Sequence, residues 1–462
     1  MNKPPLDFTR VDNLIEQSFD SMARDLMELL KFASVEGEAA PGAPFGPEVA
    51  GALGCGLDLC RRLGLEAHDL DGFCGYADLK GETQRQVGVL AHLDVVPAVA
   101  EEWDYPPFAP VMVGDEIYGR GTLDDKGPLL AALYGLKALK EAGFVPGSTV
   151  RVIMGCNEET GMACMEHYLS KFPAPDCGFT PDAEWPLIIG EKGVMHYTLS
   201  RTWSPAATPG PQLLSLNSGT AANVVPAKAE AVFSGLTLSS PLPQGVSARQ
   251  EGERTVITAS GTAAHASTPE DGDNALSKLL RFLDSLSFAP SGAREFIASI
   301  TALNRDDCCG RDMGVAGEDE LSQLSHCPTL CSLDQTGGVL TCDMRFLLTR
   351  HGDHYISILE HIAAKHQLKL EVLHCQDPLW LGKDHPMIQG LLNAYREVTG
   401  DMTEPLIIGG GTYAKMFPNF LAFGPEPHDA PALAHQANER ISKAQLLQAA
   451  KIYARAIYSL AK

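Results

Sequence analysis

The sequence predicts an α/β protein: a main domain whose mixed, mostly parallel sheet is sandwiched by helices, and an inserted α+β domain. Apolar strand-like runs alternate with amphipathic helix-like runs over residues 86–181, which is typical of such a sheet. The character changes near residue 191, where Pro/Gly-rich loops and alternating strands begin. Sheet–helix alternation resumes after residue 378, so the main domain is predicted to be discontinuous.

The first ninety residues are predicted to be mainly helical. Residues 11–33 carry apolar side chains at helical spacing, and residues 47–63 repeat the pattern. The stretch EGEAAPGAPFGP between them is a loop by its glycine and proline content. The first strand is expected to begin at residue 86.

Strands and helices then alternate along the chain. The runs VGVLAHLDVV, TVRVIMGCNEE and GFTP are expected to be strands, and GPLLAALYGLKALKEAG and residues 162–172 are expected to be helices. This order predicts a sheet that is covered on both faces. Polar residues stand at the ends of these strands, where open α/β sheets place their ligands.

The insertion is assigned to residues 191–377. Its strands include RTVITASG and GGVLTCDMRFLL, and its helices are expected at 274–286 and 355–366. The main domain then comprises residues 1–190 and 378–462. Its last part contains a helix at 387–398, the segments PLIIGGGTYAKMF and NFLAFGP, and a closing helix at 442–460.

The bulk properties exclude several classes of protein. A chain of 462 residues with 45% hydrophobic and 20% charged residues reads as a folded protein of two domains. A net charge of −22 argues against nucleic acid as a partner. The chain shows neither a secretory signal nor an apolar run long enough to cross a membrane, so a cytoplasmic location is expected. The twelve cysteines include no CxxC pair and are expected to be reduced thiols.

The most informative feature is a set of residue types that bind divalent metals. They are His92 in VLAHLDVVP, Asp124 in GRGTLDDKGP, Glu158 and Glu159 in MGCNEETG, Asp182 in FTPDAEWP, and His435 in LAHQANERI. Two imidazoles with three or four carboxylates suit a pair of divalent cations, for which zinc is the usual occupant. Each residue alone has an ordinary explanation as a helix cap, a turn residue or a surface side chain. Their joint occurrence at strand and loop boundaries favours a metal site.

Neighbouring residues suggest how such a site would work. Asp94 shares a strand face with His92, so it could hold the second imidazole N–H. Asp124 and Asp125 could cap the next helix, or one carboxylate could bridge two cations. The adjacent Glu158 and Glu159 point in different directions, so one can bind metal while the other serves as a general base.

Taken together, GVLAHLDVVP, GRGTLDDKGP, NEETG, TPDAE and GTAAHASTPEDGDNA resemble the M20 family of two-metal peptidases. The segments APFGPEVA, IYGRGTLDDKGP and GFTPDAEWPLIIGEKG are similar to its PepV-type dipeptidase branch, which includes Xaa-His and β-Ala-His dipeptidases. The resemblance extends from about residue 12 to the C-terminus. It implies that residues 1–190 and 378–462 form a catalytic domain with two metals and that residues 191–377 form a lid.

The resemblance also implies roles for individual residues. One metal would be held by His92 and Asp182, the other by Glu159 and His435, with Asp124 bridging the two metals. Glu158 would be the general base, and Asp94 would orient His92. His265 would be an oxyanion donor from the lid. Substrate contacts would come from Asn223 in AANVVP, Arg345 in CDMRF, and Gly410, Gly411 and Thr412 in GGGTYA.

The activity that the resemblance implies is hydrolysis of dipeptides that carry a free C-terminal carboxylate. Water held between two divalent ions would attack, with Glu158 as base; zinc is expected, and manganese or cobalt would also fit. The partners are then small peptides, with no membrane. The large lid is expected to supply His265 to its own chain, which favours a monomer over a dimer. The alternatives are an N-acyl amino acid amidohydrolase of the deacetylase or desuccinylase type, and a non-enzymatic peptide-binding protein, which the complete ligand set disfavours.

Overall fold

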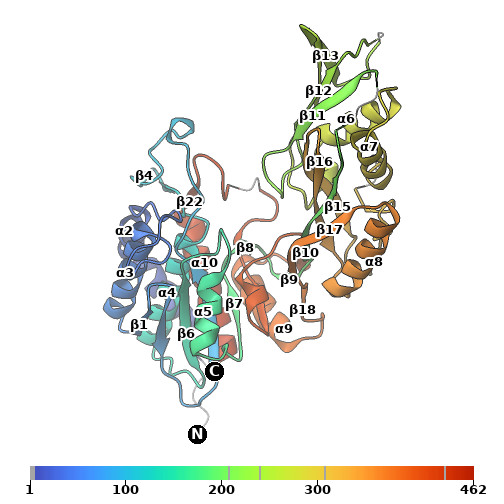
Figure 1. Ribbon diagram of the computed structural model, residues 1–462. Coiled ribbons are helices and arrows are strands. Elements are labelled where there is room, and N and C mark those ends of the chain that lie inside the picture. The colour runs from blue at the N-terminus through green and yellow to red at the C-terminus, as the bar shows by residue number, and fades with distance from the viewer. Residues whose placement is uncertain (1–5, 206–208, 239–240, 306–307, 431–432) are drawn as a thin grey trace. The chain divides into compact units, whose positions relative to one another are not determined.

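The computed structural model describes residues 6–205, 209–238, 241–305, 308–430 and 433–462. The chain forms two compact units (Figure 1). The first unit comprises Met1–Gly190, Leu381–Leu406 and Thr412–Lys462, and the second comprises Glu191–Trp380 and Ile407–Gly411.

The unit boundaries differ from the expected domains in residues 378–380 and 407–411. The glycine segment belongs to the second unit because its backbone is bound there. The Lys192 N–H donates to the carbonyl of Ile408 at 3.0 Å, and Nη1 of Arg345 donates to the carbonyl of Gly409 at 2.8 Å. A loop near the end of the chain therefore folds with the inserted segment rather than with its sequence neighbours.

The first unit begins with the helices α1 (Phe8–Gln17), α2 (Phe19–Leu30) and α3 (Pro47–Arg62). The single helix expected over residues 11–33 is interrupted at Ser18, which ends α1 and begins α2. Residues 66–79 are not helical, contrary to the sequence prediction. They form β1 (Glu66–Leu70) and β2 (Cys74–Leu79), because β2 pairs along its whole length with β6 (Thr149–Gly155).

The sheet of the first unit is mixed. The other strands are β3 (Gln86–His92), β7 (Cys177–Thr180), β20 (Phe420–Ala422) and β9 (Ile188–Glu191), and the order is β1-β2-β6-β3-β7-β20-β9. The pairs β6–β3, β3–β7 and β7–β20 are parallel, and the flanking pairs are antiparallel. The parallel centre places the C-terminal ends of β3, β6 and β7 at one edge of the sheet.

Helices from both ends of the chain cover this sheet. They are α4 (Lys126–Glu141), α5 (Ala163–Lys171), α9 (Pro386–Thr399) and α10 (Lys443–Ala461). The closing helix α10 packs against α4, α9 and β3, whereas α3 and α5 pack against β2. At the contact with α10, a Cβ on Gly135 would lie 2.8 Å from the carbonyl oxygen of Ala450, so the close approach of α4 and α10 requires glycine there.

Smaller elements of the first unit support its loops. The strands β4 (Val111–Val113), β5 (Glu116–Tyr118) and β22 (Arg440–Ser442) form a three-stranded sheet, and β8 (Ala183–Glu184) pairs with β21 (Pro425–Glu426). The 3-10 helices are η1 (Ala100–Glu102) and η3 (Tyr413–Met416). The short strands β18 (Leu379–Trp380) and β19 (Leu406–Ile408) lie at the unit boundaries.

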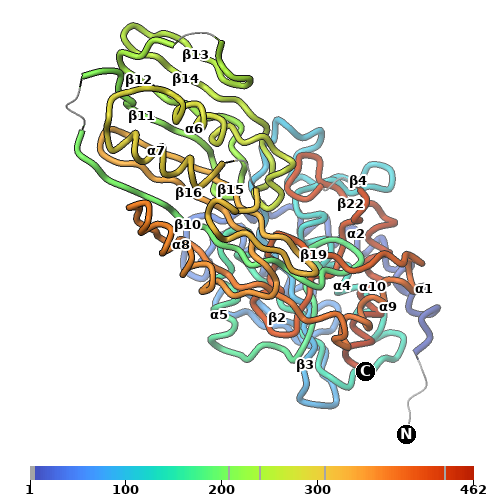
Figure 2. The backbone as a smooth tube through the Cα atoms, turned by 90° about the vertical axis from the view of Figure 1, so that its right-hand side faces the viewer, coloured from blue at the N-terminus to red at the C-terminus, as the bar shows by residue number. Residues whose placement is uncertain are grey.

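The second unit is an antiparallel sheet covered by helices. Its strands are β10 (Gly193–Thr202), β11 (Gln212–Ser218), β12 (Lys228–Ser234), β13 (Val246–Glu251), β14 (Arg254–Ser260), β15 (Ser325–Leu333), β16 (Gly337–Phe346) and β17 (Lys369–Gln376), in the order β13-β14-β12-β11-β15-β16-β10-β17. Its helices are α6 (Ala275–Ser285), α7 (Gly292–Leu303) and α8 (Gly352–Lys365), with the 3-10 turn η2 (Pro269–Asp271). Figure 2 shows these helices running over the strands, and contacts link α6 to β12 and β14, α7 to β16, and α8 to β17.

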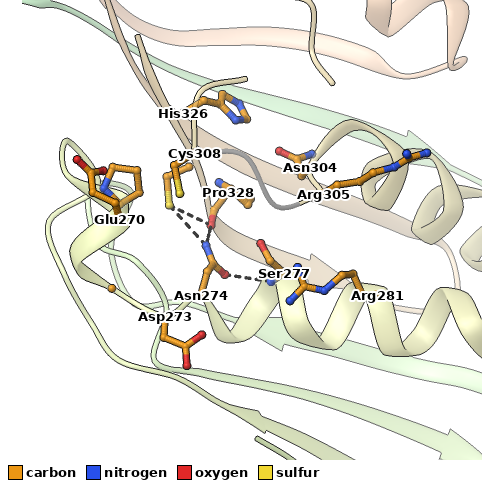
Figure 3. A pocket seen from close by; sticks show the side chains of 13 residues that line it. Glu270, Asp273, Asn274, Ser277, Arg281, Asn304, Arg305, Cys308, His326 and Pro328 are labelled. Atoms are coloured by element: carbon orange, nitrogen blue, oxygen red, sulfur yellow. Dashed lines mark hydrogen bonds between the residues drawn. The ribbon is translucent and has the colours of Figure 1, made fainter. Parts of the chain in front are cut away.

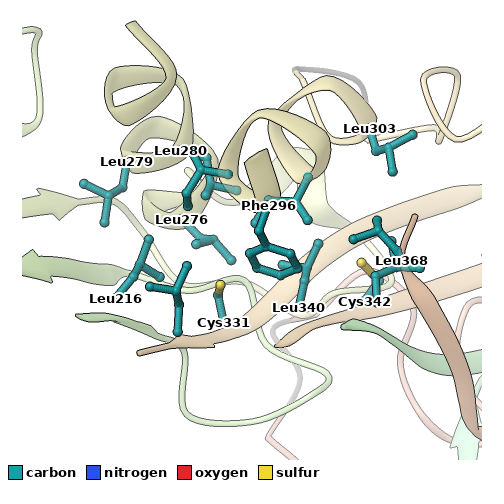
Figure 4. Packing of buried hydrophobic residues seen from close by; sticks show 14 of the residues in the cluster. Leu216, Leu276, Leu279, Leu280, Phe296, Leu303, Cys331, Leu340, Cys342 and Leu368 are labelled. Carbon is teal, nitrogen blue, oxygen red and sulfur yellow. The ribbon is translucent and has the colours of Figure 1, made fainter. Parts of the chain in front are cut away.

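The core of the second unit lies between these helices and the sheet. Leu279 and Leu280 of α6 and Phe296 of α7 face Leu216 and Leu340 of the strands (Figure 4). Helix α7 was not predicted, although the sequence carried its signals. Ser291 caps it by accepting the Arg294 N–H at 3.2 Å, and its apolar positions recur at helical spacing.

Two expectations about the chain as a whole can be compared with the structure. All twelve cysteines are free thiols, in agreement with the expectation of reduced side chains. In the described part of the chain, no helix is both long and apolar enough to cross a membrane.

Candidate metal centre

Six residues that the sequence singled out converge at one edge of the sheet in the first unit. His92 is the last residue of β3, and Glu158 and Glu159 follow β6. Asp182 follows β7, Asp124 precedes α4, and His435 lies in the loop before β22. The loops that follow β3, β6 and β7 come together, because parallel strands end at the same edge of the sheet.

Asp124 occupies the middle of the cluster. Its Oδ1 lies 2.8 Å from Nε2 of His92, and its Oδ2 lies 2.8 Å from Nε2 of His435. Nε2 of His92 is also 3.8 Å from Oδ2 of Asp182, and Nε2 of His435 is 3.1 Å from Oε2 of Glu159. One carboxylate therefore faces two histidine–carboxylate pairs, one on each oxygen.

The arrangement of these donor atoms suits the binding of divalent cations better than it suits hydrogen bonds between the side chains themselves. Among the described residues, Nε2 of His92 and Oδ1 of Asp124 are buried without a hydrogen bond, although they lie 2.8 Å apart. Ligand atoms of His92, Asp124 and Glu159 lie within 4.8 Å of one another, and so do those of His92, Glu158 and Asp182. Imidazole and carboxylate groups at this spacing are the ligands of zinc and similar metals.

The explanation of Asp124 and Asp125 as helix caps does not hold. Asp125 stands at the N-cap position of α4, but its side chain makes no capping hydrogen bond. Instead its Oδ2 accepts the backbone N–H of His92 at 3.1 Å, which fixes the end of β3. The two adjacent acids thus face the ligand cluster rather than the helix terminus.

The electrostatics of the cluster show a surplus of buried negative charge. Burial, and then the charge of Asp182, raises the pKa of Glu158 well above its usual value. Burial and the charge of Asp124 raise the pKa of both Glu159 and Asp182. Burial opposes ionisation of Asp124 too, but the neighbouring His435 and His92 side chains keep its pKa low. Divalent cations supply the positive charge that such a set of carboxylates needs.

The two histidines respond in the opposite direction. Burial favours the neutral form of His92, but the facing carboxylates of Asp124 and Asp182 raise its pKa well above the usual value. The side chain of His435 is half-exposed, and hydrogen bonds to Asp124 and Glu159 raise its pKa to about 11. Both imidazoles are therefore held among negative ligand atoms.

Asp94 contacts His92 in a different way from that expected. Strand β3 ends at His92, so Asp94 lies beyond the strand rather than on its face. Nδ1 of His92 lies 2.9 Å from the backbone carbonyl oxygen of Asp94 and 3.6 Å from its Oδ1. The Asp94 carboxylate accepts the backbone N–H of Glu159 at 3.0 Å. Asp94 therefore fixes two loops at once, one through its backbone and one through its side chain.

Sequence reasoning overlooked two further residues of this region. The ring of Tyr413 stands edge-on to His92 with ring centroids 6.1 Å apart, and its hydroxyl lies 2.8 Å from Sγ of Cys164. Thr412, a predicted substrate contact, begins the same turn and accepts the Ala414 N–H at 3.1 Å. The second residue is Glu439, which the segment HQANE places four positions after His435. An acid at this spacing was the only signal available.

The other predicted residues belong to the second unit. Asn223 and His265 are neighbours there: the carbonyl of Asn223 accepts the Ala266 N–H at 2.8 Å, and Val224 forms a β-bridge with His265. Nδ1 of His265 accepts the backbone N–H of Ser267 at 3.1 Å. In the neutral ring the proton therefore lies on Nε2, which makes Nε2 a donor.

Arg345 and the glycine loop are also neighbours within the second unit. Nε and Nη2 of Arg345 form a bidentate ion pair with Asp343 at 2.8 Å each, and Nη1 donates to the Gly409 carbonyl at 2.8 Å. A Cβ on Gly409 would lie 2.7 Å from Cβ of Ser267, so the loop approaches the His265 segment closely. Gly410 and Gly411 follow directly, so Arg345 supports the backbone of the predicted substrate loop.

The second unit also contains a polar cavity of about 290 Å³ that none of the predicted site residues lines. Figure 3 shows Asn274, Ser277 and Arg281 of the α6 segment at its wall. The Asn274 amide donates to the carbonyl of Pro328 at 2.9 Å and accepts the Ser277 N–H at 3.0 Å. Asn274 thereby caps α6 and ties it to β15, which is a structural role.

Comparisons with known proteins agree with these features. The family model described as peptidase family M20/M25/M40 matches residues 88–459. Putative dipeptidase SH1171 of Staphylococcus haemolyticus is 36% identical over 94% of this chain and 96% of its own length. Putative dipeptidase YtjP of Bacillus subtilis is 34% identical over 96% of this chain and 98% of its own length. The fold is similar to that of human carnosine dipeptidase 1, with a TM-score of 0.61, 16% identity, and coverage of 99% of both chains. The chain therefore belongs to peptidase family M20/M25/M40.

Proposed function

We propose that this chain is a metal-dependent dipeptidase that hydrolyses dipeptides carrying a free C-terminal carboxylate. The observation that carries the proposal is the Asp124 carboxylate, whose two oxygens lie 2.8 Å from Nε2 of two different histidines. Relatives at 34–36% identity over nearly the whole chain that bear the name Putative dipeptidase support the same activity.

The ligands divide into two sets that share Asp124. His92 and Asp182 would hold one divalent ion, and Glu159 and His435 would hold the other. Zinc fits the imidazole–carboxylate donors, and manganese and cobalt are accepted by similar sites. When bound, such ions polarise the peptide carbonyl and lower the pKa of water toward neutrality.

Glu158 is assigned as the general base. Burial and the neighbouring Asp182 raise its pKa, which brings the carboxylate closer to the range in which a base can both take and release a proton. Its carboxylate accepts the proton of the attacking water and then gives that proton to the leaving amine. Glu159, held 3.1 Å from His435, remains a ligand.

The second unit supplies the groups that recognise substrate, which gives it the role of a lid. The tautomer of His265 puts a proton on Nε2, which would donate to the negative charge that develops on the carbonyl oxygen. Asn223 adjoins His265, and Arg345 holds the glycine loop whose N–H groups, with Thr412, would bind the terminal carboxylate. We assign His265 to the site of its own chain, so the functional form is a monomer.

The test is a substrate panel with defined metals. Exhaustive chelation is expected to abolish hydrolysis of Ala–Ala, and addition of zinc, manganese or cobalt is expected to restore it. Dipeptides should be cleaved in preference to tripeptides and N-acyl amino acids, as measured by release of free amino acids. Full activity after chelation would contradict the metal mechanism, and preferential cleavage of N-acetyl or N-succinyl amino acids would contradict the dipeptidase assignment.

A further inference from the structure

Glu439 is a buried acid that the mechanism above does not use. Its side chain is 0% exposed, and it immediately precedes strand β22. Nη1 of Arg120 donates to its Oε2 at 2.7 Å and compensates its charge. The pair Arg120–Glu439 is therefore an ion pair removed from water, which is favourable only when further hydrogen bonds complete it.

The loop that leads to Asp124 supplies those hydrogen bonds. Oε1 of Glu439 accepts the backbone N–H groups of Leu123 at 2.8 Å and Gly121 at 3.1 Å, with a longer contact to the Asp124 N–H at 3.3 Å. Gly121 has a φ of +95°, which a residue with a side chain rarely adopts and which lets the loop turn around the carboxylate. Successive N–H groups directed at one anion form a nest, and here the anion belongs to the protein itself.

The other end of the connection is His435. It lies four positions before Glu439, and both His435 and Asn438 adopt left-handed backbone conformations, with φ of 63° and 62°. Such conformations persist in residues other than glycine only where their surroundings hold them. Several contacts hold this segment: Oδ1 of Asn438 accepts the Asp104 N–H at 2.7 Å, the carbonyl of Glu439 accepts the Gly119 N–H at 3.1 Å, and the Glu439 carboxylate is bound as described. The imidazole of His435 is itself half-exposed, so its position depends on this anchored backbone.

We propose that Glu439 is the positioning residue that couples the Asp124 loop to the His435 loop and thereby sets the metal affinity of the site. The inference rests on the proposed function, because Asp124 and His435 are its assigned ligands. Glu439 touches neither substrate nor metal. It acts by keeping Oδ2 of Asp124 and Nε2 of His435 at the 2.8 Å separation from which both can bind one ion.

The test measures zinc binding rather than activity. Glu439→Gln keeps the size of the side chain but leaves one acceptor oxygen, so an amide NH₂ must face either the N–H groups of Gly121 and Leu123 or Nη1 of Arg120. Supporting groups around metal ligands change metal affinity about 10- to 100-fold. Titration of metal-free protein against a chromophoric chelator is therefore expected to show zinc bound about 10- to 100-fold more weakly in at least one of two sites. The rise in the thermal midpoint on adding zinc should shrink accordingly.

Glu116→Gln is the matched control. Glu116 lies on β5 of the same small sheet and pairs with Arg440 at 3.2 Å, but its side chain is 42% exposed, and among the described residues no side-chain hydrogen bond links it to the Asp124 loop. This variant is expected to bind zinc like the wild type. If Glu439→Gln does not fold, Glu439→Asp decides in the same way, because it keeps the charge but withdraws the carboxylate by one methylene.

The outcomes separate the two proposals. Wild-type protein that binds no zinc would overturn the proposed function. Wild-type protein that binds two zinc ions, together with a Glu439 variant of unchanged zinc affinity, would overturn the positioning role even if the variant were less stable without metal.

Discussion

Replacing Glu158 by alanine tests the central assignment, because its neighbour Glu159 provides an internal comparison. The two carboxylates are adjacent in sequence but lie in different surroundings. Both oxygens of Glu159 lie 3.1–3.2 Å from Nε2 of His435, whereas Glu158 groups with His92 and Asp182. In the proposed assignment the ligands His92, Asp124, Asp182, Glu159 and His435 all remain when Glu158 is removed. We therefore expect Glu158→Ala to keep two bound metals and to lose turnover.

The expected loss follows from what could replace the missing base. A positioned general base contributes about 10²- to 10⁴-fold to a rate. The nearest carboxylates are engaged with histidines, Glu159 with His435 and Asp182 with His92, so neither is available as a substitute. The loss should thus lie in the upper part of the range, about 10³- to 10⁴-fold, which corresponds to about 4–5.4 kcal/mol of activation free energy.

The assay combines metal content with the rate of Ala–Ala hydrolysis at saturating zinc. Glu159→Ala is the matched variant, and it should lose zinc affinity and recover part of its rate when excess zinc is supplied. If Glu158→Ala instead lost metal but kept its rate per metal-loaded site, the roles of the two residues would have to be exchanged.

Two further predictions concern histidines of the second unit. His265→Ala removes the Nε2–H donor and should lower kcat by about 10²- to 10³-fold in steady-state assays without changing metal content. The control Ser267→Ala keeps the backbone N–H that donates to Nδ1, so it should have a much smaller effect on kcat. An unchanged kcat for His265→Ala would exclude His265 from the mechanism. Burial lowers the pKa of His326 from 6.5 to about 4. The unfolded chain therefore binds a proton at this residue that the folded chain does not bind, so His326 alone should lower the stability by about 3 kcal/mol as the pH drops from 6.5 to 4. Urea unfolding of the metal-free protein measures this slope, which should be shallower in His326→Gln; parallel slopes would contradict the assignment.

The local signals in the sequence explain much of the fold. The helical spacing over residues 47–63 and 442–460 predicted α3 and α10 to within a residue or two, because amphipathic patterns state directly which face is buried. The same reasoning failed for residues 66–79, whose strand identity depends on pairing with β6. The sequence prediction also missed α7, although the N-cap residue and the apolar spacing of this helix are present in the sequence, within a long insertion.

The sequence by itself determined which residue types are available to bind metal. Two histidines and several acids at strand ends favour divalent metals whatever the fold. The tertiary structure decided which of these side chains lie against one another. It alone set the two Asp124 oxygens against different histidines, turned Asp125 toward the backbone of His92, and assigned the glycine loop to the second unit. It alone placed the Glu439 carboxylate in the loop that leads to Asp124. The physical reason is that ligand types are local chemistry, whereas distances between segments hundreds of residues apart exist only once the sheet brings their ends together.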